Sequence, residues 1–349
     1  MAEPEADWDQ GKLSVTMGER RRSGSFTDDY SIHKTNDDAT YCKRAAVQLG
    51  YYDDPFINRF VQASSSTNDM PIRRDPEISR GYWARVKAFR TLIDQFLQKA
   101  GPSCQILNFG AGFDTLYWRL KEEGAKFRRY VDVDFSSVTA KKIRMIRKPG
   151  KPDLVSIIAN DSSTELYESG HTDLHGGDYH VVGADLRQAR ELHEKLVAAE
   201  VDFSLPTVIV CECVLIYMAE EQSASLLKYL ADSFPTVCFI NYEQVNLSDT
   251  FGAVMQRNLN TRGINLAGMA ACQSLESQKK RFLENGWTHA EDWRMDIVYS
   301  QHLPKNEVER IEKIEPLDEK ELLTQLLEHY CMVVAAKDSA GLGLDAIKF

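Results

Sequence analysis

The feature that most constrains the fold is a run of five apolar segments separated by amphipathic segments. The apolar segments, which we predict as strands, are residues 104–112, 128–135, 179–186, 206–218 and 236–244. Each of the first four is followed by a stretch in which apolar residues have helical spacing. Near-continuous apolar strands that alternate with helices are typical of a parallel sheet with both faces covered. The sequence therefore predicts an α/β fold with a doubly wound, mostly parallel sheet. Only residues 149–178, between the second and third strands, lack a clear pattern.

The chain outside this repeat is predicted to supply a tail, a helical lid and the far edge of the sheet. Residues 1–38 are polar, with few large apolar side chains, so we expect a disordered tail there. Residues 39–349 are predicted as one domain, with 39–101 as an N-terminal helical lid and 245–272 as a helical insert or cap. After the insert we expect a helix, a strand over 292–301, another helix and a last strand.

The first predicted strand runs into a glycine turn at residues 110–114, GAGFD, which raises the question of what the turn holds. A complete GxGxxG motif would need a third glycine at Thr115, and a GxxxxGK[ST] loop is absent. Asp114 stands at the start of the next helix, where its carboxylate would cap the helix and repel a phosphate. The turn therefore favours a ligand without phosphate. S-adenosylmethionine is such a ligand, because it carries a sulfonium and an ammonium group.

Acidic residues follow at the ends of the later strands, which is where ligands bind in an open parallel sheet. Asp134 ends the second strand, 24 residues after Gly110, and could accept hydrogen bonds from two ribose hydroxyls. Asp185 ends the third strand and could accept one from an adenine amino group, or it could simply cap the following helix. Glu212 lies in the fourth strand, near the position expected for a methionine moiety. Asp132 points to the same face as Asp134 and competes with it, but Asp134 lies nearer the strand end.

Longer motifs carry a resemblance to one enzyme family. CKRAAVQLGYYDDPFI, RGYWARV, LNFGAGFDT, VDVDF, GADLR, CECVLIYM, INYEQVN and SLESQKKRFLENGW occur in this order and closely resemble leucine carboxyl methyltransferase, over about residues 39–345. The resemblance implies a class I methyltransferase fold with a seven-stranded sheet, an antiparallel hairpin at its end, and a lid over the substrate pocket. It also implies S-adenosylmethionine as cofactor, bound by Lys43, Arg85, Gly110, Asp134, Asp185, Leu186 and Glu212.

The resemblance further implies a substrate and a mechanism. The family methylates the C-terminal leucine carboxylate of the catalytic subunit of type 2A protein phosphatase and so regulates assembly of the phosphatase holoenzyme. A C-terminal carboxylate has a pKa of roughly 3.5, so we expect no general base and no catalytic histidine. We assign Arg85, helped by Lys43, to the cofactor's own carboxylate, because an arginine clamp would weaken the acceptor as a nucleophile. Tyr217 and Tyr242 are candidates for positioning the acceptor, or else they pack in the core.

Other functions stay open at this point. A methyltransferase of a small-molecule acid would share the fold but have a different lid. A phosphatase-binding protein without activity and a nicotinamide dehydrogenase are further alternatives, and Asp114 and Thr115 disfavour the dehydrogenase. A related group fuses this domain to a repeat domain for modified-base synthesis in transfer RNA, and we do not expect that fusion in a chain of this length. The basic run at residues 141–151 predicts a solvated helix face rather than a docking patch.

Charge and cysteine content indicate which partners and which cellular compartment to expect. A net charge of −10 disfavours binding to nucleic acid or to an anionic membrane. No secretory signal is recognisable, and no apolar window reaches the length of a membrane span. The seven cysteines have no metal-ligand spacing, so we expect no metal site. We expect free thiols in a reducing, cytoplasmic compartment.

Overall fold

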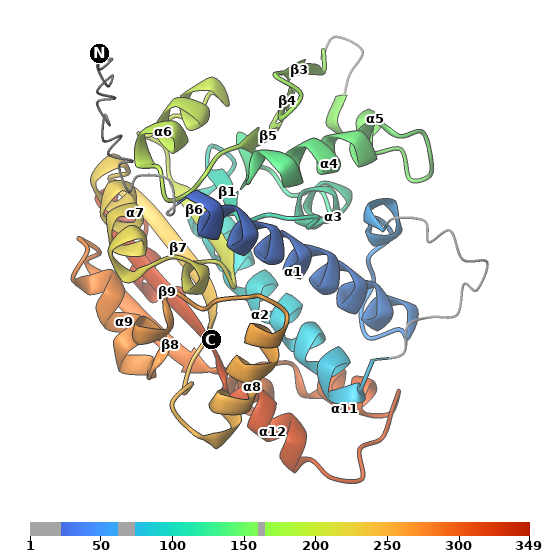
Figure 1. Cartoon of the computed structure of the whole chain (residues 1–349). Helices are drawn as coiled ribbons and strands as arrows, with labels where there is room; N and C mark the ends of the chain where they lie inside the picture. The colour runs from blue at the N-terminus through green and yellow to red at the C-terminus, as the bar shows by residue number, and fades with distance from the viewer. Residues whose placement is uncertain (1–21, 62–73, 160–164) are drawn as a thin grey trace, which may run out of the picture.

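A sheet of nine strands lies at the centre of the computed structural model, which describes residues 22–61, 74–159 and 165–349 (Figure 1). The strands are β1 (Gln105–Phe109), β2 (Arg129–Asp134), β3 (Tyr167–Ser169), β4 (Asp173–Gly176), β5 (Tyr179–Gly183), β6 (Thr207–Glu212), β7 (Thr236–Gln244), β8 (His289–Arg294) and β9 (Tyr330–Asp338). Their order across the sheet is β3-β4-β5-β2-β1-β6-β7-β9-β8.

The five strands predicted from the apolar repeat are β1, β2, β5, β6 and β7, and they lie side by side in parallel. Phe109 of β1 pairs in register with Val133 of β2 on one side and with Cys211 of β6 on the other. The chain therefore builds the sheet outward in both directions from β1. Ligands of open parallel sheets bind beyond the carboxyl ends of the strands at such a switch point. The predicted doubly wound, mostly parallel sheet is confirmed.

The edges of the sheet differ from the expected seven strands. Two extra strands, β3 and β4, come from the unpatterned segment 149–178 and add an antiparallel edge beside β5. All three residues of β3 are exposed, so this strand leaves no hydrophobic signal in the sequence. At the other edge β9 runs antiparallel between β7 and β8, as expected, although helices separate β8 from β9 along the chain.

The predicted strand over residues 292–301 is wrong after its third residue. β8 ends at Arg294, and the chain then becomes helical. The buried residues Met295, Val298 and Tyr299 explain the change, because they stand three and four positions apart and so share one face of a helix.

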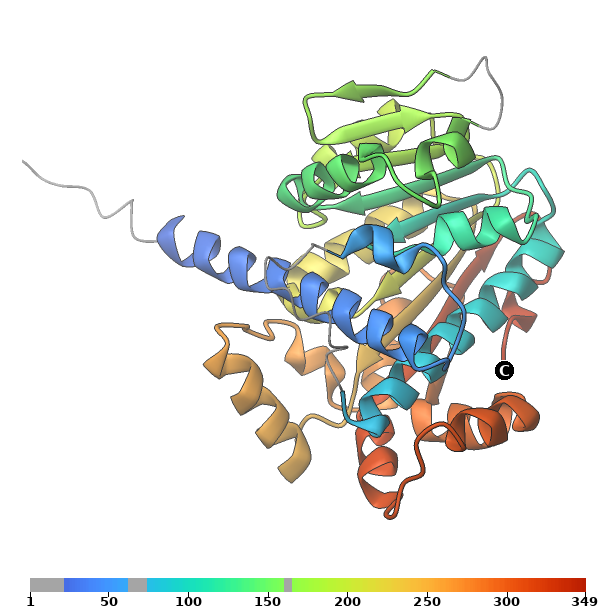
Figure 2. The same cartoon turned by 90° about the vertical axis from the view of Figure 1, so that its right-hand side faces the viewer.

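Helices cover both faces of the sheet (Figure 2). The helical elements are α1 (Arg22–Gln48), η1 (Ile57–Phe60), α2 (Pro76–Ala100), α3 (Leu116–Glu122), α4 (Ser136–Arg147), α5 (Leu154–Ala159), α6 (Ala189–Ala198), η2 (Leu215–Tyr217), α7 (Glu220–Ser233), α8 (Thr250–Thr261), η3 (Met269–Cys272), α9 (Leu275–Leu283), α10 (Met295–Ile297), η4 (Val298–His302), α11 (Lys305–Glu312), α12 (Glu321–Glu328) and η5 (Leu344–Ala346).

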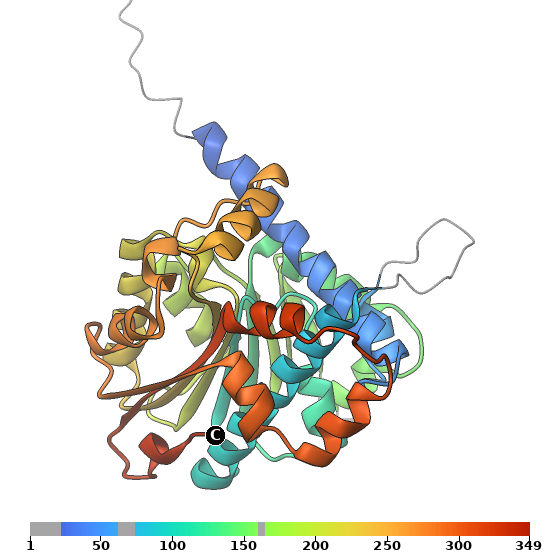
Figure 3. The same ribbon diagram turned by 90° about the horizontal axis from the view of Figure 1, so that it is seen from below.

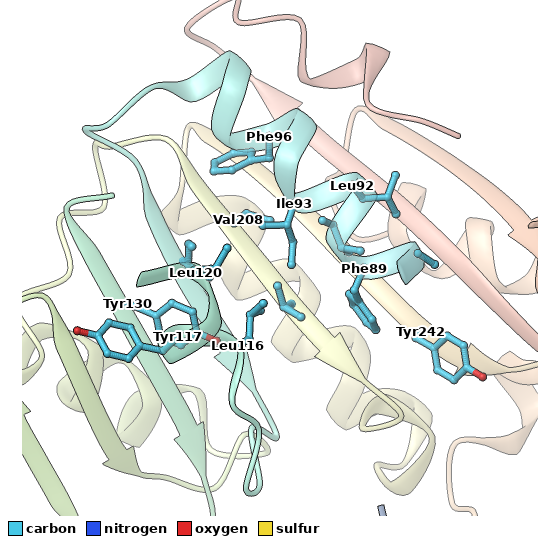
Figure 4. Close-up of a cluster of buried hydrophobic side chains, with 14 of the residues drawn as sticks. Phe89, Leu92, Ile93, Phe96, Leu116, Tyr117, Leu120, Tyr130, Val208 and Tyr242 are labelled. Atoms are coloured by element: carbon cyan, nitrogen blue, oxygen red, sulfur yellow. The ribbon is translucent and has the colours of Figure 1, made fainter. Parts of the chain in front are cut away.

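Successive strand residues point into two different cores. Ile106 of β1 belongs to the core beneath α2, α3 and α4, whereas its neighbour Leu107 belongs to the core beneath α6, α7 and α9. Figure 4 shows part of the first core, where Ile93 of α2 lies beside Val208 of β6 and Phe89 lies toward Tyr242 of β7. Because both faces of the sheet are buried, the strands read as continuous apolar runs.

α1 corrects the prediction of a disordered tail through residue 38. The helix begins at Arg22, and only residues 1–21 of the predicted tail lie outside the described residues. Its N-terminal half carries few large apolar side chains, so no core-facing pattern is visible in the sequence. Polar contacts hold the middle of the helix instead, and the clearest is a hydrogen bond of 2.8 Å from the Phe113 N–H to the Asn36 side-chain oxygen.

α1 and the predicted insert 245–272 meet on the side of the carboxyl ends of the parallel strands (Figure 3). The insert contains α8 and η3, as expected of a helical segment. Arg262, just after α8, forms an ion pair with Asp38 of α1. The two elements therefore lie in contact with each other beyond the carboxyl ends of the parallel strands.

Candidate functional site

Two adjoining cavities lie where the carboxyl ends of the parallel strands meet α1 and α2. The larger has a volume of about 300 Å³, and the smaller, of about 50 Å³, lies toward β5 and shares Gly110 and Asp134 with it. The predicted cofactor residues that line the larger cavity are Lys43, Arg85, Gly110, Asp134 and Glu212, and those that line the smaller one are Asp185 and Leu186. The structure thus brings all seven together.

The glycine turn allows the backbone to approach the cavities closely. Gly110 has a φ of +63°, and a Cβ there would lie 2.3 Å from a methyl carbon of Val214. Gly112 has a φ of +47°, and a Cβ there would lie 2.2 Å from the Asn36 side-chain oxygen. Both positions therefore require glycine, for backbone conformation and for space.

Asp134 lies at the carboxyl end of β2, beside the glycine turn. Its two carboxylate oxygens accept hydrogen bonds of 2.7 Å from the N–H groups of Gly112 and Phe135. Burial raises the pKa of Asp134 to about 6, although these two N–H groups act against the shift. The competing Asp132 is buried and accepts a hydrogen bond of 2.7 Å from Lys142. Asp134 is therefore the acid that faces the cavities.

Glu212, Arg85 and Lys43 form a charge cluster in the wall of the larger cavity. The Glu212 carboxylate pairs with the Arg85 guanidinium and, at 3.0 Å, with Lys43 Nζ. Lys43 Nζ also lies 3.6 Å from the Asp114 carboxylate. Burial opposes the charge of Lys43, but Asp114 and Glu212 outweigh it and raise the pKa of this lysine. The cluster holds two cations and two carboxylates, so it is balanced in charge.

Asp114 lies one residue before Thr115, the N-cap residue of α3. Its carboxylate accepts a hydrogen bond of 2.8 Å from the Leu116 N–H. Burial acts against its charge, but Lys43, Lys142 and this N–H together hold the pKa of Asp114 below its usual range. A fixed negative charge at the helix start disfavours a phosphate there.

Asp185 and Leu186 follow β5 and form a wall of the smaller cavity. The Asp185 carboxylate accepts hydrogen bonds from the backbone N–H of Arg187 at 2.9 Å and from the guanidinium of the same residue at 2.8 Å. The N-cap residue of α6 is Gln188, so the alternative in which Asp185 only caps this helix is not supported. Leu186 is buried and supplies an apolar surface.

The two tyrosine candidates occupy different environments. Tyr217 lines both cavities, and its hydroxyl interacts with Thr35 of α1. Tyr242 is buried in the core and lines neither cavity. The Arg85 guanidinium lies 4.4 Å from the centre of the Tyr242 ring, which stacks on Tyr330 at 5.2 Å. The position of Tyr242 therefore suits support of Arg85 rather than contact with an acceptor.

Several cavity residues were missed by the sequence analysis. Ile32, Thr35 and Asn36 come from the part of α1 that was expected to be a tail, and no local pattern marks them. Gln244 ends β7, and Tyr330 begins the antiparallel β9 at the same edge of the sheet. The end of β7 could have been found with the rule that ligands bind at the carboxyl ends of parallel strands.

Among the described residues, no group of histidine, cysteine, aspartate and glutamate side chains is arranged to hold a metal ion. All seven cysteines are free thiols. One histidine, His33, lines the larger cavity and packs its ring against Phe135 at 4.8 Å, which the sequence did not indicate. None of the described helices has the length and apolar character needed to cross a membrane.

A family model and curated proteins both relate this chain to leucine carboxyl methyltransferase. A family model described as leucine carboxyl methyltransferase matches residues 31–231. The probable leucine carboxyl methyltransferase 1 of Caenorhabditis briggsae is 49% identical over 324 residues, which cover 93% of this chain and 96% of that protein. Leucine carboxyl methyltransferase 1 of Bos taurus is 46% identical, covering 94% of this chain and 96% of that protein. The tRNA wybutosine-synthesizing protein 4 of Homo sapiens is 34% identical over 92% of this chain but only 46% of its own length.

Proposed function

Because the chain belongs to the leucine carboxyl methyltransferase family, we propose that it methylates the C-terminal leucine α-carboxylate of the catalytic subunit of type 2A protein phosphatase, with S-adenosylmethionine as methyl donor. Family membership makes the chain a methyltransferase. The phosphatase as partner and substrate, and regulation of its holoenzyme assembly by the ester, are parts of the proposal.

The observation that carries the proposal is a row of functional groups along the carboxyl edge of the sheet. Asp185 follows β5, Asp134 ends β2, Gly110 follows β1 and Glu212 ends β6, and these strands are consecutive neighbours. Neighbouring strands are about 4.8 Å apart, so the row spans roughly 14 Å. A nucleoside that carries an amino-acid arm suits a row of this length and composition.

The charges along the row suit S-adenosylmethionine. Asp134 would accept from the ribose hydroxyls, and Asp185 from the adenine amino group. The cluster of Lys43, Arg85, Glu212 and Asp114 would hold the amino-acid arm. That arm is a zwitterion, so it adds one positive and one negative charge to a balanced cluster, and each finds an opposite partner. When bound, this cofactor supplies an electrophilic methyl group on a sulfonium.

The protein's own contribution to the transfer is placement and exclusion of water. An acceptor carboxylate is ionised at neutral pH, so no side chain has to remove a proton. Tyr217 is our candidate for orienting one acceptor oxygen, because a neutral donor stabilises the starting carboxylate less than an arginine would. Alignment of the reacting atoms can lower the activation barrier by up to roughly 7–11 kcal/mol. The sulfonium and the carboxylate carry opposite charges that are neutralised as the methyl group moves, so a site without water destabilises the reactants more than the transition state.

A cytoplasmic location belongs to the same proposal. Five of the seven free cysteines are buried, namely Cys104, Cys211, Cys238, Cys272 and Cys331. Free buried thiols without a disulfide framework are typical of proteins that work in a reducing compartment.

The test is transfer of radiolabelled methyl groups from S-adenosylmethionine to the intact phosphatase catalytic subunit, beside a subunit that lacks its last leucine. We expect label on the intact subunit only, in a form that mild base releases, as an ester requires. Label on both subunits would contradict a C-terminal acceptor. Label on neither, with cofactor binding shown separately by calorimetry, would favour transfer to a small-molecule acid.

A further inference from the structure

A buried polar atom in the larger cavity has no hydrogen-bond partner within the described part of the chain. Gln244 lines this cavity and is only 5% exposed, and its Oε1 makes no hydrogen bond to any residue of the described ranges. A buried carbonyl oxygen left without a donor costs about 1–3 kcal/mol. An atom of this kind in a cavity wall indicates a ligand that brings its own N–H or O–H group.

The surrounding structure holds Gln244 in place. Its backbone N–H donates to the Glu243 carboxylate at 3.1 Å, and its backbone carbonyl accepts from the Gln278 side chain at 2.8 Å. Across the strand it pairs in register with Tyr330, and the Gln244 side-chain NH₂ group donates to the Tyr330 hydroxyl, which leaves Oε1 as the unpaired end of the amide. Because backbone and side chain are both held, Oε1 is presented to the cavity in a defined position.

The order of the strands places Gln244 beyond the cofactor row. That row runs from Asp185 beside β5 to Glu212 at the end of β6. Gln244 ends the next strand, β7, and Tyr330 begins β9, one strand further. The nucleoside would occupy the side toward β5, so the space beyond Glu212 is left for the molecule that receives the methyl group.

The chemistry of the acceptor identifies the missing donor. An ionised carboxylate only accepts hydrogen bonds, so it cannot satisfy another oxygen. The nearest donor on a C-terminal residue is its own backbone N–H, which is attached to the same Cα as the carboxylate. Resting on the proposed function, we propose that Gln244 Oε1 accepts a hydrogen bond from the peptide N–H of the acceptor residue and thereby positions its α-carboxylate.

This assignment makes Gln244 a determinant of specificity. In aspartate and glutamate side chains the carboxylate is separated from the backbone N–H by one or two additional bonds. A fixed acceptor for the N–H therefore favours an α-carboxylate over a side-chain carboxylate. It also favours a peptide-linked residue over an acid that has no neighbouring N–H.

The test removes this hydrogen bond from each side in turn. A phosphatase catalytic subunit is prepared by peptide ligation with its C-terminal leucine replaced by the 2-hydroxy acid of the same shape, so that an ester oxygen replaces the N–H. With the wild-type enzyme we expect kcat/KM to fall about tenfold on this substrate. Gln244→Met keeps the side-chain length but removes Oε1. We expect kcat/KM of this variant on the leucine substrate to fall by a similar factor. On the hydroxy-acid substrate its kcat/KM should equal that of the wild-type enzyme, because the hydrogen bond is already absent there.

Two controls separate positioning from misfolding. Gln325→Met makes the same chemical change at an exposed site on α12 and should leave both substrates unaffected. Binding of S-adenosylhomocysteine by calorimetry should stay within twofold in Gln244→Met, which also shows that this variant is folded.

Three results would overturn part or all of this account. If Gln244→Met loses the same factor on both substrates, the hydrogen bond does not exist. If it loses S-adenosylhomocysteine binding in step with the rate, Gln244 serves the cofactor instead of the acceptor. If the wild-type enzyme does not label the unmodified subunit, the proposed function fails, and this inference fails with it.

Discussion

Asp134 carries a charge that changes within an accessible pH range. Burial raises its pKa from 3.8 to about 6. The group therefore contributes stability to the unliganded fold that is fully present below pH 3.8 and is lost as the pH rises through 6. Ribose hydroxyls would donate to the ionised form, so cofactor binding should follow the opposite pH trend from stability.

We predict that the affinity for S-adenosylhomocysteine falls about tenfold between pH 7.5 and pH 5, because pH 5 lies about one unit below the pKa of Asp134. Calorimetric titrations across this range measure the change. Asp134→Asn should bind weakly throughout and show no step near pH 6. A step that survives in this variant would assign the titration to a different group.

Among the secondary-structure elements, α1 shows how a helix can shape a site and leave no mark in the sequence pattern. The stretch of this helix from Ile32 to Asp38 is held by single polar contacts at the glycine turn and near α8 rather than by an apolar stripe. Periodicity detects the burial of side chains in a core and cannot detect contacts of this kind. The same stretch supplies Ile32, Thr35 and Asn36 to the larger cavity.

We predict that Asn36→Ala weakens S-adenosylhomocysteine binding about 5- to 100-fold, because it leaves the buried Phe113 N–H of the glycine turn without its acceptor. Asp37→Ala is the matched control, since Asp37 lies on the same helix but does not line the cavity. It should change the dissociation constant less than twofold. Equal effects of the two substitutions would show that α1 acts through general helix stability and not through the turn.

For the molecule as a whole, the sequence best predicts the positions of those site residues that are set by the order of strands and helices along the chain. Asp134, Asp185 and Glu212 could be placed at one edge because each follows an apolar strand of a parallel sheet. Tyr330 could not, because its place beside Gln244 depends on β9 returning antiparallel between β7 and β8. The edge strands β3 and β4 were missed because they are short and, in β3, exposed.

Glu243 connects three parts of the molecule behind the site. It is fully buried in β7, and its carboxylate accepts a hydrogen bond of 3.0 Å from the Ile216 N–H. The Ile216 carbonyl in turn accepts one of 2.8 Å from the Gly268 N–H. A Cβ on Gly268 would lie 2.7 Å from the Met218 carbonyl oxygen, so the insert and the loop after β6 pack backbone against backbone. One carboxylate thus ties the sheet to the loop that carries Tyr217 and to the insert.

Burial raises the pKa of Glu243 from 4.5 to about 7, although Arg281 and two backbone N–H groups act against the shift. The stability that this group contributes is therefore fully present below pH 4.5 and is lost as the pH rises through 7. Glutamine at this position cannot ionise. We predict that Glu243→Gln gains roughly 3 kcal/mol of stability relative to the wild type between pH 4.5 and pH 8. Urea unfolding of both proteins at each pH measures this difference, in which the other titrating groups cancel. A difference that stays constant with pH would show that the pKa of Glu243 in the folded protein is not raised above its value in the unfolded chain, and that the link from the sheet to the insert is charged at neutral pH.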